Sequence, residues 1–126
     1  MKNGFLCAVA VALLVGSAAC STVNKHVSKG FDAYAKLDYA TAEIEFKKAL
    51  EDDKDDPYAQ LNLGALYQAT GRPQLAVPLY EKVLETGKNI RPNRKSANSK
   101  TKESSPTLAE IARANIEALS AAGKIK

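Results

Sequence analysis

The feature that most constrains this chain is an internal repeat of 34 residues. The sequence can be laid on itself at that shift without a gap. The matching positions are then Gly30 and Gly64, Ala35 and Ala69, Ala42 and Ala76, Phe46 and Tyr80, Lys48 and Lys82, Ala49 and Val83, and Leu50 and Leu84. Matches of Gly and Ala arise easily by chance, but this set also pairs two aromatic residues and two leucines. A repeat of this length is typical of an array in which one supersecondary unit stacks on the next.

Each unit of the repeat predicts two helices. In the second unit, Asp56 is a favourable N-cap and Pro57 suits the first helical position. Apolar residues then recur at helical spacing as far as Gly71, where we expect the first helix to stop. Pro73 begins the next helix, which we expect to end at Gly87. Pro78 lies inside this second helix, and we expect its ring to face solvent because it cannot donate a backbone hydrogen bond.

The first unit and the C-terminal segment follow the same pattern. A helix is expected over about 23–36, and Asp38 then caps a second helix whose apolar stripe includes Phe46. A further helix is expected over 106–123, because Thr107 and Glu110 have the spacing of a capping box. Open repeat arrays need a final element that covers the last apolar face. We therefore predict an all-α fold with two helix–turn–helix units and a C-terminal capping helix.

The two units resemble the tetratricopeptide repeat (TPR), a helix–turn–helix of 34 residues. The second unit carries Leu63-Gly64-x-x-Tyr67 and then Ala76-x-x-x-Tyr80, and the first carries Gly30 and then Ala42-x-x-x-Phe46. The resemblance covers residues 23–56 as unit 1 and 57–88 as unit 2. The sequence departs from the family pattern at four positions. His26 and Gln60 stand where the family often has Trp, and Lys54 and Lys88 stand where it has Pro. The residues expected to pack the repeats together are Gly30, Ala42, Phe46, Gly64, Tyr67, Ala76 and Tyr80.

The resemblance also implies a binding groove, because the first helix of each unit lines a concave face in this family. The positions that would face the groove here are Asn24, Val27, Phe31, Tyr34, Tyr58, Leu61, Ala65 and Gln68. Aromatic side chains on such a face suit the burial of a partner side chain. One subclass of the family holds a chain terminus with Lys, Arg and Asn. Since this groove has Asn24 but no Lys or Arg, that function is not carried over.

The beginning of the chain predicts a secretory signal peptide over residues 1–19. One Lys precedes the apolar run Phe5–Val15, and small residues then lead to Cys20. This ending resembles a bacterial lipobox, which implies that Cys20 is lipidated and that residues 20–22 form a lipid-anchored N-terminus. Ser17 departs from the aliphatic residue usual in that family, and cleavage by an ordinary signal peptidase at the same bond stays open. Ser21 favours the outer membrane of a Gram-negative envelope, facing the periplasm.

Residues 89–105 predict a flexible basic linker, rich in Lys, Arg, Asn and Ser with Ile90 as its main apolar residue. The whole chain has a formal net charge of +4. A basic segment can bind nucleic acid or anionic lipid. The secretory signal and the lack of aromatic residues in the linker argue against nucleic acid.

Catalytic and metal chemistry are not predicted. The chain has one His and two Cys, too few for a Cys/His metal site. On a helical wheel the neighbours of His26 are Thr22, Lys29 and Gly30, so no carboxylate of its own helix orients it. The acidic cluster 51–56 does not have the spacing of a calcium loop. We therefore expect no enzyme activity, no metal and no cofactor.

These observations predict a small TPR lipoprotein that acts as an adaptor in the bacterial cell envelope, for example within a secretion, pilus or outer-membrane assembly. Its partner would be another envelope protein or peptide, with the membrane reached through lipidated Cys20 and no nucleic acid bound. A homo-oligomer is an open alternative. Two further alternatives are a soluble periplasmic TPR module and a surface element that binds anionic lipid through the basic linker.

Overall fold

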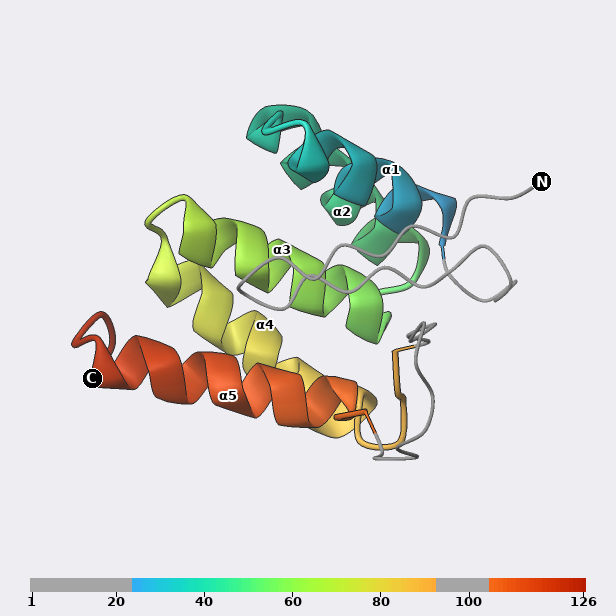
Figure 1. The fold of residues 1–126 in the computed structure, drawn as a ribbon. Coiled ribbons are helices and arrows are strands. Elements are labelled where there is room, and N and C mark those ends of the chain that lie inside the picture. Colours follow the sequence, from blue (N-terminus) through green and yellow to red (C-terminus); the bar gives the residue numbers. More distant parts are fainter. Residues whose placement is uncertain (1–23, 93–104) are drawn as a thin grey trace, which may run out of the picture.

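A computed structural model of the chain describes residues 24–92 and 105–126. Within these ranges the protein is all-helical and has no strand. The helices are α1 (Lys25–Ala35), α2 (Tyr39–Asp52), α3 (Pro57–Ala69), α4 (Pro73–Thr86) and α5 (Leu108–Ala121) (Figure 1). The predicted signal peptide (1–19), the lipid-anchored residues 20–22 with Cys20, and most of the basic linker (93–104) lie outside the described residues.

Three of the helix starts predicted from sequence are confirmed by side-chain caps, whereas α4 begins at Pro73 without one. Asp38 accepts a hydrogen bond from the Thr41 backbone N–H, and Asp56 accepts from two backbone N–H groups at the start of α3. Thr107 and Glu110 form both hydrogen bonds of a capping box. These caps satisfy N–H groups that the first turn of a helix leaves without an intrahelical partner. Asn24 caps α1 in the same way, so that helix starts slightly later than the pattern predicted.

The two turns within the repeat units have the same unusual backbone. Leu37, between α1 and α2, has φ 62°, and Gly71, between α3 and α4, has φ 75°. Glycine adopts this left-handed region readily, whereas a leucine is strained there. Pro78 lies within α4 and is exposed to solvent, as predicted.

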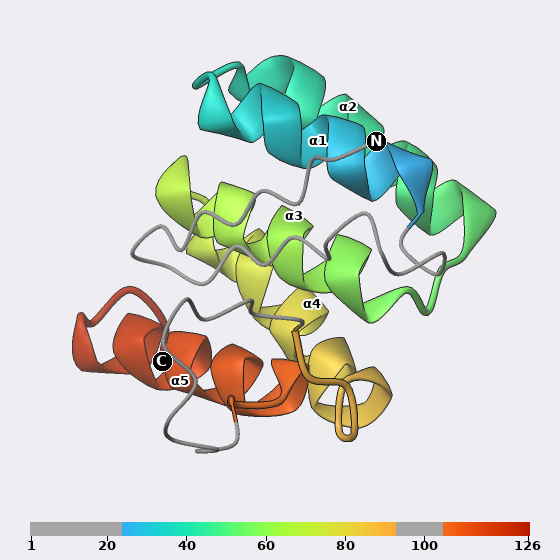
Figure 2. The same cartoon turned by 45° about the vertical axis from the view of Figure 1, so that its right-hand side comes forward.

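The helices pack as neighbours in sequence order. α1 pairs with α2, and α3 pairs with α4. The packing of α2 on α3 joins these two pairs, and α5 packs on α4. Weaker contacts join α1 to α3 and α3 to α5. Figures 1 and 2 show α1, α3 and α5 in one layer with α2 and α4 behind them. We call the side formed by this first layer the α1–α3–α5 face.

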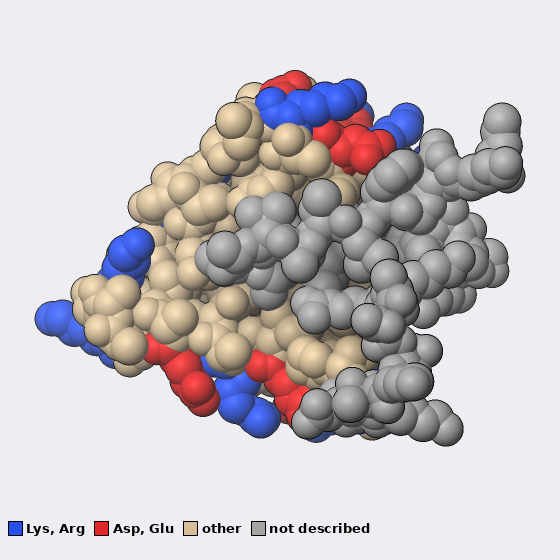
Figure 3. Space-filling model, in the orientation of Figure 1, with Lys and Arg blue, Asp and Glu red and all other residues tan. Residues whose placement is uncertain are grey.

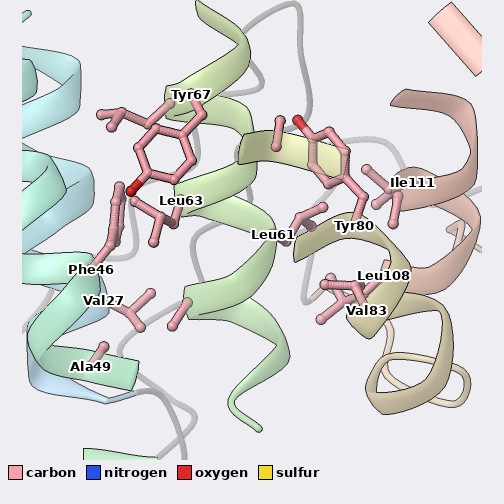
Figure 4. Packing of buried hydrophobic residues seen from close by; sticks show 14 of the residues in the cluster. Val27, Phe46, Ala49, Leu61, Leu63, Tyr67, Tyr80, Val83, Leu108 and Ile111 are labelled. Carbon is pink, nitrogen blue, oxygen red and sulfur yellow. The ribbon is translucent and has the colours of Figure 1, made fainter. Parts of the chain in front are cut away.

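One apolar core runs between the two layers (Figure 4). Phe46 and Tyr80 are its two fully buried rings, and each lies over the glycine of its own unit. A Cβ placed on Gly30 would be 2.6 Å from the Phe46 ring, and one placed on Gly64 would be 2.7 Å from the Tyr80 ring. Ala42 and Ala76 are also fully buried, and Tyr67 is buried with them. The glycines therefore let the paired helices approach closely enough to enclose an aromatic ring.

The start of α5 is fixed to the end of α4. The Leu108 N–H donates to the Ile90 carbonyl at 2.8 Å, and the Ala109 N–H donates to the Gly87 carbonyl at 3.3 Å. Leu108 is fully buried in the core. Arg91 donates from its guanidinium to the Ser105 carbonyl. The ends of the segment predicted to be a flexible linker are thus held against the helices.

A polar cluster ties the first unit to the second at Glu43 of α2. Its carboxylate accepts hydrogen bonds from Arg72 at 2.7 Å, from Lys47 at 2.7 Å and from the Tyr67 hydroxyl at 3.3 Å. The Arg72 guanidinium also lies 4.5 Å from the centre of the Tyr67 ring. Hydrogen bonds from Arg72 and then Lys47 lower the pKa of Glu43 to about 2.

Candidate partner-binding face

Charged side chains lie along the α1 and α5 edges of the α1–α3–α5 face in Figure 3. Between these edges, the described residues that can be seen are of other types. The sequence of α3 itself contains no Asp, Glu, Lys or Arg. A surface of this kind favours contact with apolar or neutral polar groups, because a charge placed there would lose hydration without gaining an ionic partner.

Phe31 and Ala65 form a small apolar cluster on α1 and α3, and Tyr34 packs both against this cluster and against the main core. Phe31 is only 4% exposed, while Tyr34 is half-buried. The Tyr34 ring lies 5.2 Å from the ring of Tyr39 at an interplanar angle of 51°. Burial, and then the neighbouring Tyr39, raise the pKa of Tyr34. This cluster brings together three residues that the sequence assigned to the groove.

Two other residues assigned to the groove lie elsewhere. Val27 and Leu61 are fully buried in the main core, so their side chains present no surface to a partner. The reason is that α1 and α3 each contact neighbours in both layers, and the buried stripe of each helix is wider than the pattern suggested. Tyr58 and Gln68 remain partly exposed on α3. We therefore take the partly exposed Tyr34, Tyr58 and Gln68 as the candidate binding face, with the buried Phe31 and Ala65 packed beneath Tyr34.

Asn24, the remaining groove residue, belongs to a polar cluster with His26. Its side chain accepts from the His26 backbone N–H at 2.8 Å and donates to Asp52 at 3.2 Å. His26 Nδ1 is 2.6 Å from Glu45 Oε2, and its Nε2 is 3.9 Å from Asp52 Oδ2. A hydrogen bond from His26, and then one from Lys48, lower the pKa of Glu45.

This pairing adds two carboxylates to the sequence-based view of His26, which found none among its neighbours on its own helix. That view considered only the helix on which His26 lies, whereas both carboxylates come from α2. Periodicity within one helix cannot reveal partners on another. The cluster joins α1 to α2, and both ring nitrogens face carboxylates.

A second polar group lies between α3, α4 and α5. The Tyr80 hydroxyl donates to Gln68 Oε1 at 2.8 Å. Burial raises the pKa of Tyr80, and a hydrogen bond with the Asn115 side chain acts in the opposite direction. Asn115 itself is buried on α5. Sequence reasoning missed this group, although a polar residue within the apolar stripe of 108–119 was its signal.

Of the acidic cluster 51–56, Asp52 contacts Asn24 and His26, and two other carboxylates are used locally. Asp53 accepts from the Asp55 backbone N–H, and Asp56 caps α3. Gln60, at the position where the TPR family often has Trp, donates to the Lys54 carbonyl and accepts from Thr86. Over 24–92 and 105–126, no group of three or more His, Cys, Asp or Glu is placed to hold a metal ion. No helix within the same ranges is both long and apolar enough to cross a membrane.

Comparison of the chain with protein-family models, curated proteins and solved structures found no match.

Proposed function

We propose that this chain is a small TPR lipoprotein of the bacterial cell envelope that binds another envelope protein or peptide through its α1–α3–α5 face. The observation that carries the proposal is the packing of Phe31, Tyr34 and Ala65 against one another on α1 and α3, together with the absence of charged residues from α3. Aromatic side chains that are partly buried before binding lose little conformational freedom when a partner covers them.

The glycine–ring pairs support the assignment to the TPR family. Gly30 with Phe46, and Gly64 with Tyr80, occupy equivalent positions in the two units. A repeat that uses one packing device twice favours a stacked array over an irregular helical bundle. The family's first-helix groove then corresponds to the α1–α3–α5 face.

Binding is favoured over catalysis because the only histidine of the chain is engaged in the fold. His26 contacts the carboxylates of Glu45 and Asp52 through its two ring nitrogens. A general base that activates a nucleophile needs one free nitrogen directed at that group. We therefore assign His26 to the packing of α1 on α2.

The partner-binding proposal is tested by removing aromatic surface from the face. The double variant Tyr34→Ala with Tyr58→Ala is expected to lose its crosslinked partner in cells, since truncation of aromatic anchors weakens binding by about 2 kcal/mol or more. Ile44→Ala is the control, because Ile44 is an exposed apolar residue on α2 in the other layer. Thermal melting checks that all variants fold. Retention of every crosslinked partner by the folded double variant would contradict the proposal.

The membrane anchor is tested separately at Cys20. Growth with an alkyne fatty acid should label the wild-type protein and not Cys20→Ala, because the thiol carries the first lipid in this class. Label that persists in Cys20→Ala removes the lipoprotein assignment. Signal cleavage without label would instead support the soluble periplasmic alternative.

A further inference from the structure

The turn between α1 and α2 holds a leucine in a backbone conformation that suits glycine. Leu37 has φ 62°, and Gly71, at the equivalent position of the second unit, has φ 75°. In both turns this residue and the next one donate their N–H groups back to carbonyls of the last helical turn, a pattern that usually takes glycine at this position. Leu37 is 72% exposed, so packing offsets little of its strain. The pairing of α1 with α2 therefore retains a local strain that the pairing of α3 with α4 does not have.

The sequence around this turn is compatible with an uninterrupted helix. Residues 33–42 read AYAKLDYATA and contain neither Gly nor Pro, whereas the equivalent residues 67–76 contain Gly71 and Pro73. Ala, Leu and Lys are among the best helix formers. If Leu37 took the right-handed helical conformation, α1 and α2 would join into one helix over 25–52 and the strain would be removed. The second unit cannot do the same, because Pro73 lacks an N–H and blocks a helix interior.

α1 is placed so that it can be exchanged without disturbing the other helices. It is joined to α2 by residues 36–38 alone, and among the helices that the structure describes it contacts only α2 and α3. Figure 2 shows α1 and α2 at one end of the array. A second copy would offer the same surface to α1, including the Phe46 ring that lies over Gly30 and the Glu45 carboxylate beside His26. Exchange would therefore keep the contacts of α1 while removing the strain at Leu37.

We propose that this chain forms a domain-swapped dimer in which α1 and α2 join into one helix and α1 packs on α2 and α3 of a second copy. A short hinge under strain favours this exchange over the closed monomer when the protein concentration is high. The candidate binding face is then built from two chains, with Tyr34 from one copy and Tyr58 from the other. The inference does not depend on which partner this face binds.

The first experiment measures the oligomeric state. The full chain is unfolded in urea, refolded at low and at high protein concentration, and analysed by size-exclusion chromatography with light scattering. The wild type should refold as a monomer at low concentration and partly as a dimer at high concentration. The isolated dimer should persist on dilution, because α1 must unfold from its partner before it can return. A wild type that is monomeric at every concentration overturns the inference.

Two variants of Leu37 separate strain in the hinge from contacts of the exposed side chain. Leu37→Gly relieves the strain in the closed form and should lower the association constant of the dimer by about a hundredfold, roughly tenfold for each of two hinges. Leu37→Ala is the matched control, since alanine keeps the strain and the helix propensity but removes the apolar side chain. It should dimerise as the wild type does. If Leu37→Ala loses the dimer as fully as Leu37→Gly, the leucine side chain drives association and the exchange is wrong. Thermal melting confirms that both variants fold.

A second experiment identifies the exchange itself. Isotope-labelled and unlabelled chains are mixed in urea and refolded together at high concentration, and isotope-filtered NMR then detects contacts between different chains. The contact between Gly30 and the Phe46 ring, which lies within one chain in the monomer, should appear between chains in the mixed dimer. A dimer in which this contact stays within each chain is a surface association and overturns the inference.

Discussion

The ring of Tyr80 occupies the space that a side chain on Gly64 would need. A Cβ at Gly64 would lie 2.7 Å from Cε1 of that ring, and a Cβ at Gly30 would lie 2.6 Å from the ring of Phe46. Real Cβ atoms do not approach carbon so closely, so each ring and glycine form one packing device. The device appears twice, 34 residues apart, and sets how closely the helices of each pair approach.

Gly64→Ala should therefore destabilise the protein. In an exposed helix the same change would raise the free energy of unfolding by about 1 kcal/mol, but here we expect a loss of about 1–3 kcal/mol from overpacking. Urea unfolding measures the difference. Combining Gly64→Ala with Tyr80→Leu should cost less than the two single changes added together, because the smaller side chain makes room. A stabilised Gly64→Ala variant would show that the ring moves without penalty.

Leu37→Gly should stabilise the protein. Leu37 has φ 62° and is 72% exposed, so its side chain offers little packing to offset the left-handed backbone. We expect the free energy of unfolding to rise by about 0.5–1 kcal/mol, because the backbone strain that is relieved exceeds the entropy that glycine adds to the unfolded state. The matched control is Gly71→Ala at the equivalent turn, where nothing lies within 4 Å of the new Cβ. That change should lower the free energy of unfolding by about 1 kcal/mol through backbone strain alone. A destabilised Leu37→Gly would mean that the leucine side chain contributes contacts that exceed the strain.

Glu43 should make the stability of the protein depend on acidic pH. The pKa of Glu43 is about 2 in the fold, whereas its ordinary value is 4.5. Its ion pairs therefore stabilise the folded state at pH values above 4.5. That contribution is lost as pH falls from about 5 to 2. Because Arg72 and Lys47 are partly exposed, we expect about 1–2 kcal/mol at neutral pH.

The measurement for Glu43 compares wild type with Glu43→Gln by urea unfolding at a series of pH values. The stability difference should shrink as pH falls from 5 to 3. Glu85→Gln is the control, since the Glu85–Lys88 pair is exposed on both sides and should show almost no difference at any pH. A difference between wild type and Glu43→Gln that stays constant with pH would contradict the assignment of the ion pairs.

Leu108→Ala should destabilise the whole domain if α5 is part of the fold. Leu108 is fully buried against the end of α4, and loss of such a side chain lowers the free energy of unfolding by about 2–5 kcal/mol. Leu75→Ala is the matched control, because Leu75 is 50% exposed and should change stability by less than about 1 kcal/mol. Thermal melting and urea unfolding measure both variants. A small effect of Leu108→Ala would mean that α5 is an appendage and that the repeat pairs are stable without it.

Some residues of the candidate site could be predicted from the sequence, and others could not. The resemblance to the TPR family implied that Phe31, Tyr34 and Ala65 share one face, and the structure brings these three side chains together. Asn115 was recognised only as a member of the stripe of its helix. Its burial beside Tyr80 of α4 depends on how the two helices pack, and no spacing within a single helix contains that information.

The sequence alone determined the all-helical class, the places where helices begin and the interval between the units. Caps such as Asp38, Asp56 and Thr107 act on N–H groups two or three residues away, so they depend only on nearby sequence. The tertiary structure alone decided the burial of Val27 and Leu61, the carboxylates that face His26 and the position of Asn115 beside Tyr80. Each of these depends on how closely, and at what angle, separate helices pack. That geometry results from the sum of all core contacts, including the two rings held over their glycines.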